Sequence, residues 1–563
     1  MCGIIGITGS TTTRDRLING LRRLEYRGYD SAGLAVNGAD GLDRSRAVGK
    51  IKALESALHE TPIDGPTGIA HTRWATHGRP TEANAHPHAT GRVVIVHNGI
   101  IENFADIRVA LKDRAFESET DSEVIAHLMD ENLSTGASTE AAFQATLNAL
   151  KGAFAIAMMI EGEAGRIYLA RRGSPLVIGY GDGEMYLGSD AIALAGLTRD
   201  VCYLEEGDWA VMTPHGVEIR DASGTSVRRP KVESKVDGGM IEKGEYAHFM
   251  LKEIHEQSDT VARTLAPYID QSSRRFTIEP NITQIFKDAD RAVAVACGTA
   301  YFAALTSKYW FEDLARLPLE CDIASEYRYR NPVLPTSGPA LFVSQSGETA
   351  DTLAAAKYSR QQGAPAIAVV NVPESSIARE VDYLLPTSAG PEIGVASTKA
   401  FTAQLSVLAA TAVAAGAARG LIDDTRHGEL IDDLNSAPRL IAEALAAEPS
   451  IAEIGQAISG ARDILFLGRG RFQPLAFEGA LKMKEISYIH AEGYAAGELK
   501  HGPIALITDG VPVVVIAPYD DLFEKTRSNM EEIQARGASV VLISDERGLD
   551  AAGGRADHII RLP

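Results

Sequence analysis

Cysteine and basic charge are both scarce in this sequence of 563 residues. Its four cysteines form no C-x-x-C pair and are too few for a disulfide framework, so we expect a reducing, cytoplasmic compartment. Lys and Arg number 55 against 75 Asp and Glu, and the formal net charge of −20 disfavours binding to nucleic acid or to an anionic membrane. Local hydrogen-bond donors must therefore hold any anionic substrate. The cysteines are Cys2, Cys202, Cys297 and Cys321.

Long hydrophobic runs are nearly absent as well. The one membrane-like stretch, Ala400–Ala418, is rich in alanine, contains hydroxyl and amide side chains, and is bounded by Lys399 and Arg419. We predict a buried helix there rather than a membrane span. The start of the chain, MCGIIGITGS, has neither the basic region nor the long apolar run of a signal peptide.

The remaining composition is that of a globular protein, with 45% apolar and 23% charged residues. The length predicts about three or four domains. Residues 1–220 contain many short strand patterns with two helices, 14–24 and 122–132, which indicates antiparallel sheets covered by helices. Residues 221–246 are polar and predict a linker. In 247–430 and 431–563, apolar runs alternate with long helical patterns, which predicts two α/β domains with parallel sheets between helix layers.

These last two segments repeat one another. Three pairs of matching sequences are separated by 170 to 175 residues, which predicts two copies of one α/β unit. The pairs begin at Gly298 and Gly468, at Gly363 and Gly537, and at Val381 and Ala556. The first copy continues past its last strand into the alanine-rich helix, whereas the second ends at Pro563. The repeat therefore leads us to expect that a loop and a helix of the second copy are missing.

Cys2 is a candidate nucleophile. If the initiator Met is removed, the α-amine of Cys2 lies beside its own thiol, and an α-amine pKa of roughly 7.7–8.0 makes it a base near neutral pH. The alternative is a small residue at a frayed terminus.

Polar motifs elsewhere in the first segment support a site around Cys2. Arg73 can bind a carboxylate and Asp121 an ammonium group, while Asn98 and Gly99 offer the N–H donors of an oxyanion hole. The structural alternatives are an N-cap for Asp121 and a hairpin turn at Asn98-Gly99, after a strand that ends at His97. The motifs are Arg27-Gly28-Tyr29-Asp30-Ser31, His71 to Gly78, His97-Asn98-Gly99 and Glu119 to Ser122.

Five histidines fall within 27 residues, so a metal site has to be considered. Their spacings are scattered, and no cysteine or acidic ligand pattern accompanies them, so we expect no metal. They are His71, His77, His86, His88 and His97.

Taken together, these motifs resemble those of class II glutamine amidotransferases. The resemblance implies an α+β N-terminal-nucleophile fold, an αββα sandwich, in which Cys2 attacks the glutamine carboxamide and ammonia is released. It also implies that Asn98 and Gly99 form the oxyanion hole. The glutamine-binding residues that it implies are Arg73, Thr76, His77 and Asp121.

A second candidate site begins at Ser344-Gln345-Ser346-Gly347-Glu348-Thr349, which follows an apolar strand and opens a helix. Hydroxyls and free N–H groups at a helix N-terminus suit a phosphate monoester. The alternative is an ordinary capping box. The sequence contains no P-loop motif, and Gly468-Arg469-Gly470 alone is weak evidence for a dinucleotide site.

Glu478, Lys482 and Glu485 follow at i, i+4 and i+7, so they share one helix face. Together with His501 and a phosphate site, a carboxylate and an amine can carry out an enolisation. The alternative is a surface ladder of ion pairs.

These segments resemble the tandem sugar-isomerase domains of the glucosamine-6-phosphate synthase family. The resemblance implies that Glu485 moves a proton between C1 and C2 of fructose 6-phosphate with help from Lys482. It also implies that His501 opens the sugar ring from a second subunit, hence a homodimer, and that Trp74 gates an internal ammonia path. Val395 and Ser397 would line the sugar site. The residues implied to bind the sugar phosphate are Thr299, Ser344, Gln345, Ser346 and Thr349.

The implied reaction converts glutamine and fructose 6-phosphate into glutamate and glucosamine 6-phosphate, with ammonia passed internally and with no metal or organic cofactor. Two features depart from the family: Ala300 replaces a serine, and the tail that carries the imine-forming lysine lies beyond Pro563. We therefore expect the 563-residue chain to hydrolyse glutamine and to make little glucosamine 6-phosphate. A glutaminase alone and a non-catalytic sugar-phosphate-binding module remain alternatives.

Overall fold

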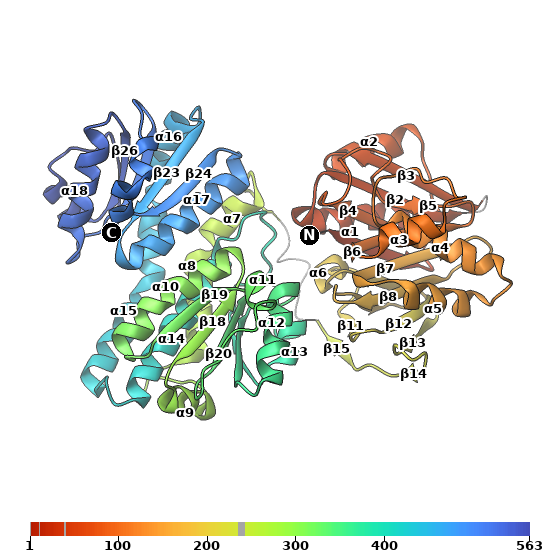
Figure 1. Ribbon diagram of the computed structural model, residues 1–563, viewed down its shortest axis with the longest axis horizontal. Coiled ribbons are helices and arrows are strands. Elements are labelled where there is room, and N and C mark those ends of the chain that lie inside the picture. The colour runs from red at the N-terminus through yellow and green to blue at the C-terminus, as the bar shows by residue number, and fades with distance from the viewer. Residues whose placement is uncertain (1, 11, 39–40, 235–242) are drawn as a thin grey trace. The chain divides into compact units, whose positions relative to one another are not determined.

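The computed structural model describes residues 2–10, 12–38, 41–234 and 243–563. The chain divides into two compact units, Met1–Glu242 and Lys243–Pro563, drawn in red to yellow and in green to blue in Figure 1.

The first unit contains two antiparallel sheets. The eight-stranded sheet has the order β15 (Lys231–Glu233), β11 (Asp200–Tyr203), β9 (Val177–Tyr180), β10 (Met185–Gly188), β1 (Gly3–Thr8), β4 (Thr67–Arg73), β2 (Ser31–Gly38) and β3 (Gly41–Val48). The seven-stranded sheet has the order β14 (Ser226–Val227), β13 (Gly216–Arg220), β12 (Trp209–Thr213), β8 (Ile167–Arg172), β7 (Gly152–Ile160), β6 (Val93–Ile101) and β5 (His88–Ala89).

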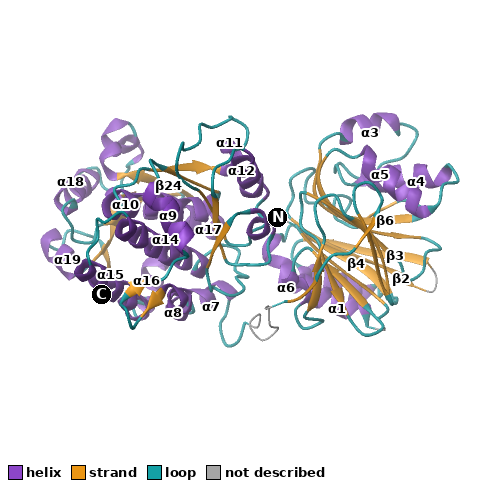
Figure 2. Ribbon diagram, turned by 90° about the horizontal axis from the view of Figure 1, so that it is seen from below, coloured by secondary structure: helices purple, strands orange, loops and turns teal. Residues whose placement is uncertain are grey.

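Helices cover the outer face of each sheet, with α1 on one side and α3, α4 and α5 on the other (Figure 2). The eight-stranded sheet packs against α1 (Thr13–Leu24), α2 (Ile51–Glu60) and α6 (Ala191–Leu194). The seven-stranded sheet packs against α3 (Phe104–Ala110), α4 (Glu123–Ser134) and α5 (Thr139–Ala149).

The strands are apolar on both faces because each sheet is buried on both sides. In β1, Ile4 points into the core between the two sheets, whereas Ile5 and Ile7 point into the core under the helices. In β6, Val94 and Val96 join the central core, and Val93 and Ile95 join the core under α4 and α5. Three apolar layers separated by two sheets confirm the predicted αββα sandwich.

Two features of this unit differ from the sequence-based expectations. The structure has more helices than the two predicted; α2, for example, buries Ile51, Leu54 and Leu58, which have helical spacing. The predicted linker at 221–246 is wrong over its first part, because β14 pairs with β13 and β15 pairs with β11. Residues 235–242 lie outside the described part of the chain.

The second unit contains two five-stranded parallel sheets with the same strand order. The first is β19 (Leu319–Ile323), β18 (Ala292–Ala296), β20 (Ala340–Ser344), β21 (Ala366–Val370) and β22 (Tyr383–Pro386). The second is β24 (His490–Ala495), β23 (Asp463–Gly468), β25 (Pro512–Ile516), β26 (Ser539–Ser544) and β27 (His558–Arg561). In chain order both read 2-1-3-4-5, which confirms the predicted repeat.

Helices cover both faces of each parallel sheet, so each copy has three layers. On the first sheet, α8 (Gln257–Leu265), α9 (Pro280–Asp288), α10 (Gly298–Leu314), α14 (Lys399–Ala418) and α15 (Asp424–Leu445) lie opposite α11 (Ala324–Tyr327), α12 (Ala350–Gln361) and α13 (Ser376–Glu380). On the second, α16 (Glu448–Ile458) and α17 (Gln473–Ser487) lie opposite α18 (Phe523–Gln534) and α19 (Glu546–Ala552). Helix α7 (Phe249–His255) and the short pair β16 (Ile269–Asp270) and β17 (Arg275–Phe276) complete the unit.

Helix α14 is the only described helix long and apolar enough to cross a membrane. It is mostly buried, because its alanine face packs against α8 and α10 in the core of the first sugar-isomerase-like copy. The prediction of a core helix agrees with this packing. Helix α15 corrects the predicted boundary between residues 430 and 431: it is continuous there, and Ile431 is buried in the first copy's core.

Candidate functional site

Cys2 lies immediately before β1, next to the end of β4. The Trp74 N–H donates to Cys2 Sγ at 3.3 Å, and the thiol lies 3.7 Å from the Trp74 carbonyl oxygen, which accepts from it. Burial raises the pKa of the Cys2 thiol. The thiol is therefore protonated at neutral pH, and nucleophilic attack needs a base that removes the proton.

Asn98 and Gly99 lie within β6, not after it. The strand continues to Ile101 and pairs with β7, so the predicted strand end at His97 and the hairpin alternative are both wrong. Gly99 has φ +130°, and a Cβ there would lie 2.0 Å from the Ala153 carbonyl oxygen, which explains the glycine. The Asn98 side-chain amide donates to the Cys2 carbonyl oxygen at 3.1 Å, so the structure brings Asn98 to Cys2.

Arg73, the last residue of β4, is buried and supports the loop that follows it. Its guanidinium donates to the carbonyl oxygens of His77, of Gly78 at 3.0 Å and of Arg79 at 3.3 Å. A guanidinium has five N–H groups. These three bonds therefore leave donors that can bind a carboxylate.

The turn from Arg27 to Ser31 supports the same loop from the other side. A Cβ on Gly28 would lie 2.5 Å from the Arg73 carbonyl carbon and the Trp74 nitrogen, so only glycine fits. Asp30 accepts from the Ala75 N–H at 2.7 Å, and its own N–H donates to the Arg73 carbonyl at 3.0 Å. This motif positions the loop.

Asp121 does not cap α4, contrary to the structural alternative. The N-cap position belongs to Ser122, and Asp121 Oδ2 instead accepts from the Ile101 N–H at 2.8 Å. Asp121 is buried and is thereby tied to the end of the strand that carries Asn98 and Gly99.

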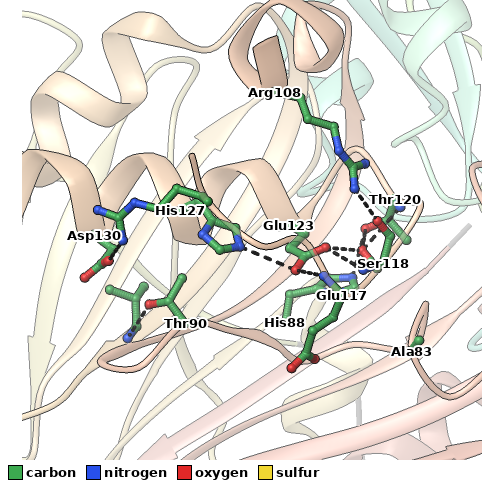
Figure 3. Close-up of polar contacts among 12 residues, drawn as sticks. Ala83, His88, Thr90, Arg108, Glu117, Ser118, Thr120, Glu123, His127 and Asp130 are labelled. Atoms are coloured by element: carbon green, nitrogen blue, oxygen red, sulfur yellow. Dashed lines mark hydrogen bonds and ion pairs between the residues drawn. The ribbon is translucent and has the colours of Figure 1, made fainter. Parts of the chain in front are cut away.

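Glu123 organises the segment that carries Asp121 (Figure 3). Its carboxylate accepts from the N–H groups of Glu117 and Ser118 and from the Ser118 hydroxyl, each at 2.7 Å. Burial opposes ionisation, but the His127 imidazole, 3.5 Å away, and hydrogen bonds from Ser118 and the Glu117 backbone outweigh it and lower the pKa of Glu123 to about 2. Glu123 is not among the site residues predicted from the sequence, although it directly follows the predicted motif Glu119 to Ser122.

The remaining residues predicted to bind glutamine lie on the loop after β4. Thr76 is exposed, with its hydroxyl 3.4 Å from His77 Nδ1, and the His77 ring packs edge-on against Phe104 at 6.0 Å. Trp74 is 41% exposed and packs edge-on against Tyr29.

Four of the five clustered histidines are buried. Burial lowers the pKa values of His71 and His88 to about 3 and of His97 to about 4, and that of His86 also falls well below its usual range. They are therefore neutral imidazoles at physiological pH. Among residues 2–10, 12–38, 41–234 and 243–563, no group of three or more His, Cys, Asp or Glu is arranged to hold a metal ion.

In the second unit, residues 344–349 connect β20 to α12, as predicted. The Gly347 N–H donates to Ser344 Oγ at 3.0 Å, and the Glu348 N–H donates to Ser346 Oγ at 3.1 Å. Thr349 is the N-cap residue of α12, and its hydroxyl lies 3.2 Å from Ser344 Oγ. The loop lies at the carboxyl end of β20, beside the switch in strand order between β18 and β20, where open α/β sheets bind ligands.

Ser397 and Val395 lie in the loop before α14. Ser397 Oγ donates to Glu392 at 2.8 Å, and the same carboxylate accepts from the N–H groups of Thr398 and Ala400. Ser397 therefore takes part in fixing this loop, while Val395 is 48% exposed.

Thr299 connects the two sugar-isomerase-like copies. It follows β18 in the first copy, but its hydroxyl accepts from Lys482 at 2.8 Å and donates to Glu478 at 3.0 Å, both on α17 of the second copy. Lys482 also pairs with Glu485 at 2.7 Å. Lys482 also pairs with Glu478 at 3.4 Å, so the ladder of ion pairs is present, but Glu478 is buried and this end of the ladder does not lie on the surface.

Burial raises the pKa of Glu478 to about 7, against the opposing effects of Lys482 and Thr299. Above about pH 4.5 the unfolded carboxyl group loses its proton, whereas the folded one keeps it up to about pH 7. The free energy of unfolding should therefore fall as the pH rises through this window. We expect the Glu478→Gln variant to lack this contribution, so its melting temperature relative to wild type should rise between pH 5 and pH 7.5. Scanning calorimetry at several pH values measures the difference, and a constant difference would contradict the raised pKa.

His501 is exposed, at the end of a short 3-10 helix (Ala496–His501). Among the described residues, no hydrogen bond or ion pair joins its side chain to Lys482 or Glu485. The structure of one chain therefore does not bring His501 to the other predicted catalytic residues.

Comparison with known proteins identifies the class to which these two units belong. Residues 71–196 match the glutamine amidotransferase domain family, and residues 285–414 and 457–563 match the SIS domain family. The second unit is similar to the C-terminal domain of glucosamine-fructose-6-phosphate aminotransferase from Francisella tularensis, with 40% identity and a TM-score of 0.55. That match covers 57% of this chain and 90% of the other. The protein is thus a glutamine amidotransferase domain joined to two SIS domains.

Curated relatives narrow this to one family. The chain is 54% identical to the glutamine–fructose-6-phosphate aminotransferase (isomerizing) of Zymomonas mobilis, over 100% of this chain and 93% of the relative. It is 53% identical to the protein of the same name from Bradyrhizobium diazoefficiens, over 98% of this chain and 91% of the relative. The chain belongs to the glutamine–fructose-6-phosphate aminotransferase (isomerizing) family.

Proposed function

We propose that this chain converts fructose 6-phosphate into glucosamine 6-phosphate with glutamine as the nitrogen donor, releasing glutamate. Membership of the family supports the reaction, and it replaces the expectation from the sequence that the chain makes little glucosamine 6-phosphate. The observation that carries the proposal is the meeting of Cys2, Trp74 and Asn98 at the end of β4, because it places a thiol beside an amide donor suited to an oxyanion.

In the amidotransferase unit, Cys2 Sγ attacks the carboxamide carbon of glutamine once the initiator Met has been removed. The freed α-amine of Cys2 takes the thiol proton and delivers it to the departing ammonia. Asn98 and Gly99 stabilise the oxyanion, and water then hydrolyses the thioester. Arg73 binds the α-carboxylate and Asp121 the α-amine, with Thr76 and His77 on the same binding loop.

In the SIS unit, the hydroxyls and N–H groups of residues 344–349 bind the phosphate at the N-terminus of α12. Glu485 moves the proton between C1 and C2, and Lys482, 2.7 Å away, stabilises its carboxylate. Thr299, which also accepts from Lys482 of α17, takes part in binding the sugar phosphate, and Val395 and Ser397 line the sugar site. Ammonia passes between the units without release, and Trp74 gates its path.

We also infer a homodimer in the cytoplasm. The exposed side chain of His501 supports a role across a subunit interface, where it opens the sugar ring. Four free thiols support a reducing compartment.

Product analysis tests the proposal. The chain is incubated with glutamine and fructose 6-phosphate, and glutamate and glucosamine 6-phosphate are both quantified. Formation of both products supports the proposed reaction. Glutamate alone would reduce the function to a glutaminase, and neither product would favour a non-catalytic sugar-phosphate-binding module.

Arg73 should determine the affinity for glutamine more than the rate of chemistry. Losing a charge-assisted contact costs about 1.5–3 kcal/mol, so we expect Arg73→Ala to raise the KM for glutamine by about 10- to 100-fold, with a smaller effect on kcat. The matched control is Arg79→Ala, because Arg79 is an exposed neighbouring cation that contributes only its carbonyl oxygen. An unchanged KM for Arg73→Ala would show that Arg73 serves only to hold the 77–79 loop.

A further inference from the structure

His71 is a fully buried residue of β4, and it contacts β6, the strand that carries the proposed oxyanion donors Asn98 and Gly99. Its Nε2 lies 3.0 Å from Asn98 Oδ1 and 3.0 Å from the His97 carbonyl oxygen. In the sequence, His71 begins the polar motif His71 to Gly78 and is one of the five clustered histidines, and the proposed mechanism does not use it.

The carbonyl oxygens of His97 and Cys2 fix the direction of the hydrogen bonds that His71 and Asn98 make. The His97 carbonyl oxygen can only accept, so His71 Nε2 carries the proton. Asn98 Oδ1 then accepts from the same N–H, and Asn98 Nδ2 faces the Cys2 carbonyl oxygen at 3.1 Å. A flipped Asn98 amide would place its NH₂ against the imidazole N–H and its oxygen against the Cys2 carbonyl, so both contacts would become repulsive.

We propose that His71 is a positioning residue, whose Nε2–H holds the Asn98 amide with its nitrogen toward Cys2 and the developing oxyanion. This inference rests on the proposed glutaminase reaction and assigns His71 a role within it. His71 does not touch the substrate, and it acts through Asn98.

The surroundings of His71 keep its imidazole neutral. Its Nδ1 is buried and has no hydrogen-bond partner among the described residues, and the His86 ring lies 4.1 Å away. The charged or titratable groups near it are His97, His86 and Arg73. Burial is the main reason that the pKa of His71 falls to about 3. Changing His71 should therefore alter the rate without adding or removing a step in the pH profile above pH 5.

The test measures kcat and KM for glutamine hydrolysis by the full chain in four variants. Removing one oxyanion donor costs about 10²–10³ in kcat, so we expect His71→Met, which only releases that donor, to lower kcat by about 10- to 100-fold with little change in KM. His71→Gln is the matched control, because its amide N–H lies near the Nε2 position, and we expect it to retain most of the activity. In an Asn98→Ala background, His71→Met should lower kcat less than about twofold further.

Equal losses from His71→Met in the presence and absence of the Asn98 side chain would overturn the proposal and indicate a merely structural role. A wild-type kcat in His71→Met, or a His71→Gln variant as poor as His71→Met, would also overturn it. If His71→Met does not fold, His71→Asn replaces it, because its shorter amide reaches only the Nδ1 position and should lose the activity that His71→Gln keeps. A wild-type rate in Asn98→Ala alone would instead contradict the proposed oxyanion hole.

Discussion

Replacing Cys2 by alanine is expected to abolish glutamate release, with a loss in kcat on the order of 10⁴- to 10⁶-fold. No other group takes over the attack, since the remaining contacts at this point are the backbone of Trp74 and the Asn98 amide. The measurement is glutamate formation from glutamine. Cys202→Ala is the matched control, because Cys202 is a buried free thiol of the same unit, in β11. Substantial glutamate release by Cys2→Ala would exclude Cys2 as the nucleophile.

The same assay identifies the base. Burial raises the pKa of the Cys2 thiol, so a thiolate does not form unaided at neutral pH. A chain that retains residues in front of Cys2 has a peptide nitrogen in place of the α-amine, and we expect it to be as inactive as Cys2→Ala. Mass spectrometry of the N-terminus shows which form is present. Full activity with the extension in place would require another base.

Local patterns in the sequence predicted most of this architecture. The apolar strand patterns of the first unit predicted antiparallel sheets covered by helices, and the matching anchors of the second predicted two repeated parallel sheets. The αββα sandwich itself was predicted only through the family resemblance of the motifs. Helix α2 could also have been predicted from the sequence, since Ile51, Leu54 and Leu58 share one face. The hairpin-turn alternative at Asn98-Gly99 was wrong because an Asn-Gly pair is typical of turns but is not confined to them. A glycine with φ +130° also occurs where a strand passes close to a neighbouring carbonyl group.

Long-range contacts could not be predicted in this way. Thr299 bonds to Glu478, 179 residues further on, and His71 bonds to Asn98, which lies in the other sheet. Neither contact has a local signature, because each depends on how complete sheets pack. The same holds for Glu478, whose shifted pKa comes from burial between two domains rather than from its neighbours in sequence.

Replacing Glu485 by glutamine should stop formation of glucosamine 6-phosphate while leaving glutamate release largely intact. A positioned acid or base contributes about 10²–10⁴-fold, and glutamine keeps the volume of glutamate but cannot exchange the proton. Lys482 loses its ion pair with Glu485, at 2.7 Å, but keeps Glu478, at 3.4 Å, and the Thr299 hydroxyl, so the helix face should remain in place. The measurement is the ratio of glucosamine 6-phosphate to glutamate produced from fructose 6-phosphate and glutamine.

Glu478→Gln is the matched control, because it makes the same change two turns away on the same face of α17, beside the same lysine. Glutamine can still accept from the Thr299 hydroxyl, and Glu478 is only 6% exposed, so we expect a loss of less than about tenfold. If Glu478→Gln lost more glucosamine 6-phosphate formation than Glu485→Gln, the proton transfer would be assigned to Glu478 instead. Its pKa of about 7 already suits an acid–base group at neutral pH, so only the comparison of the two variants separates a buried structural carboxyl group from the one that reaches the sugar.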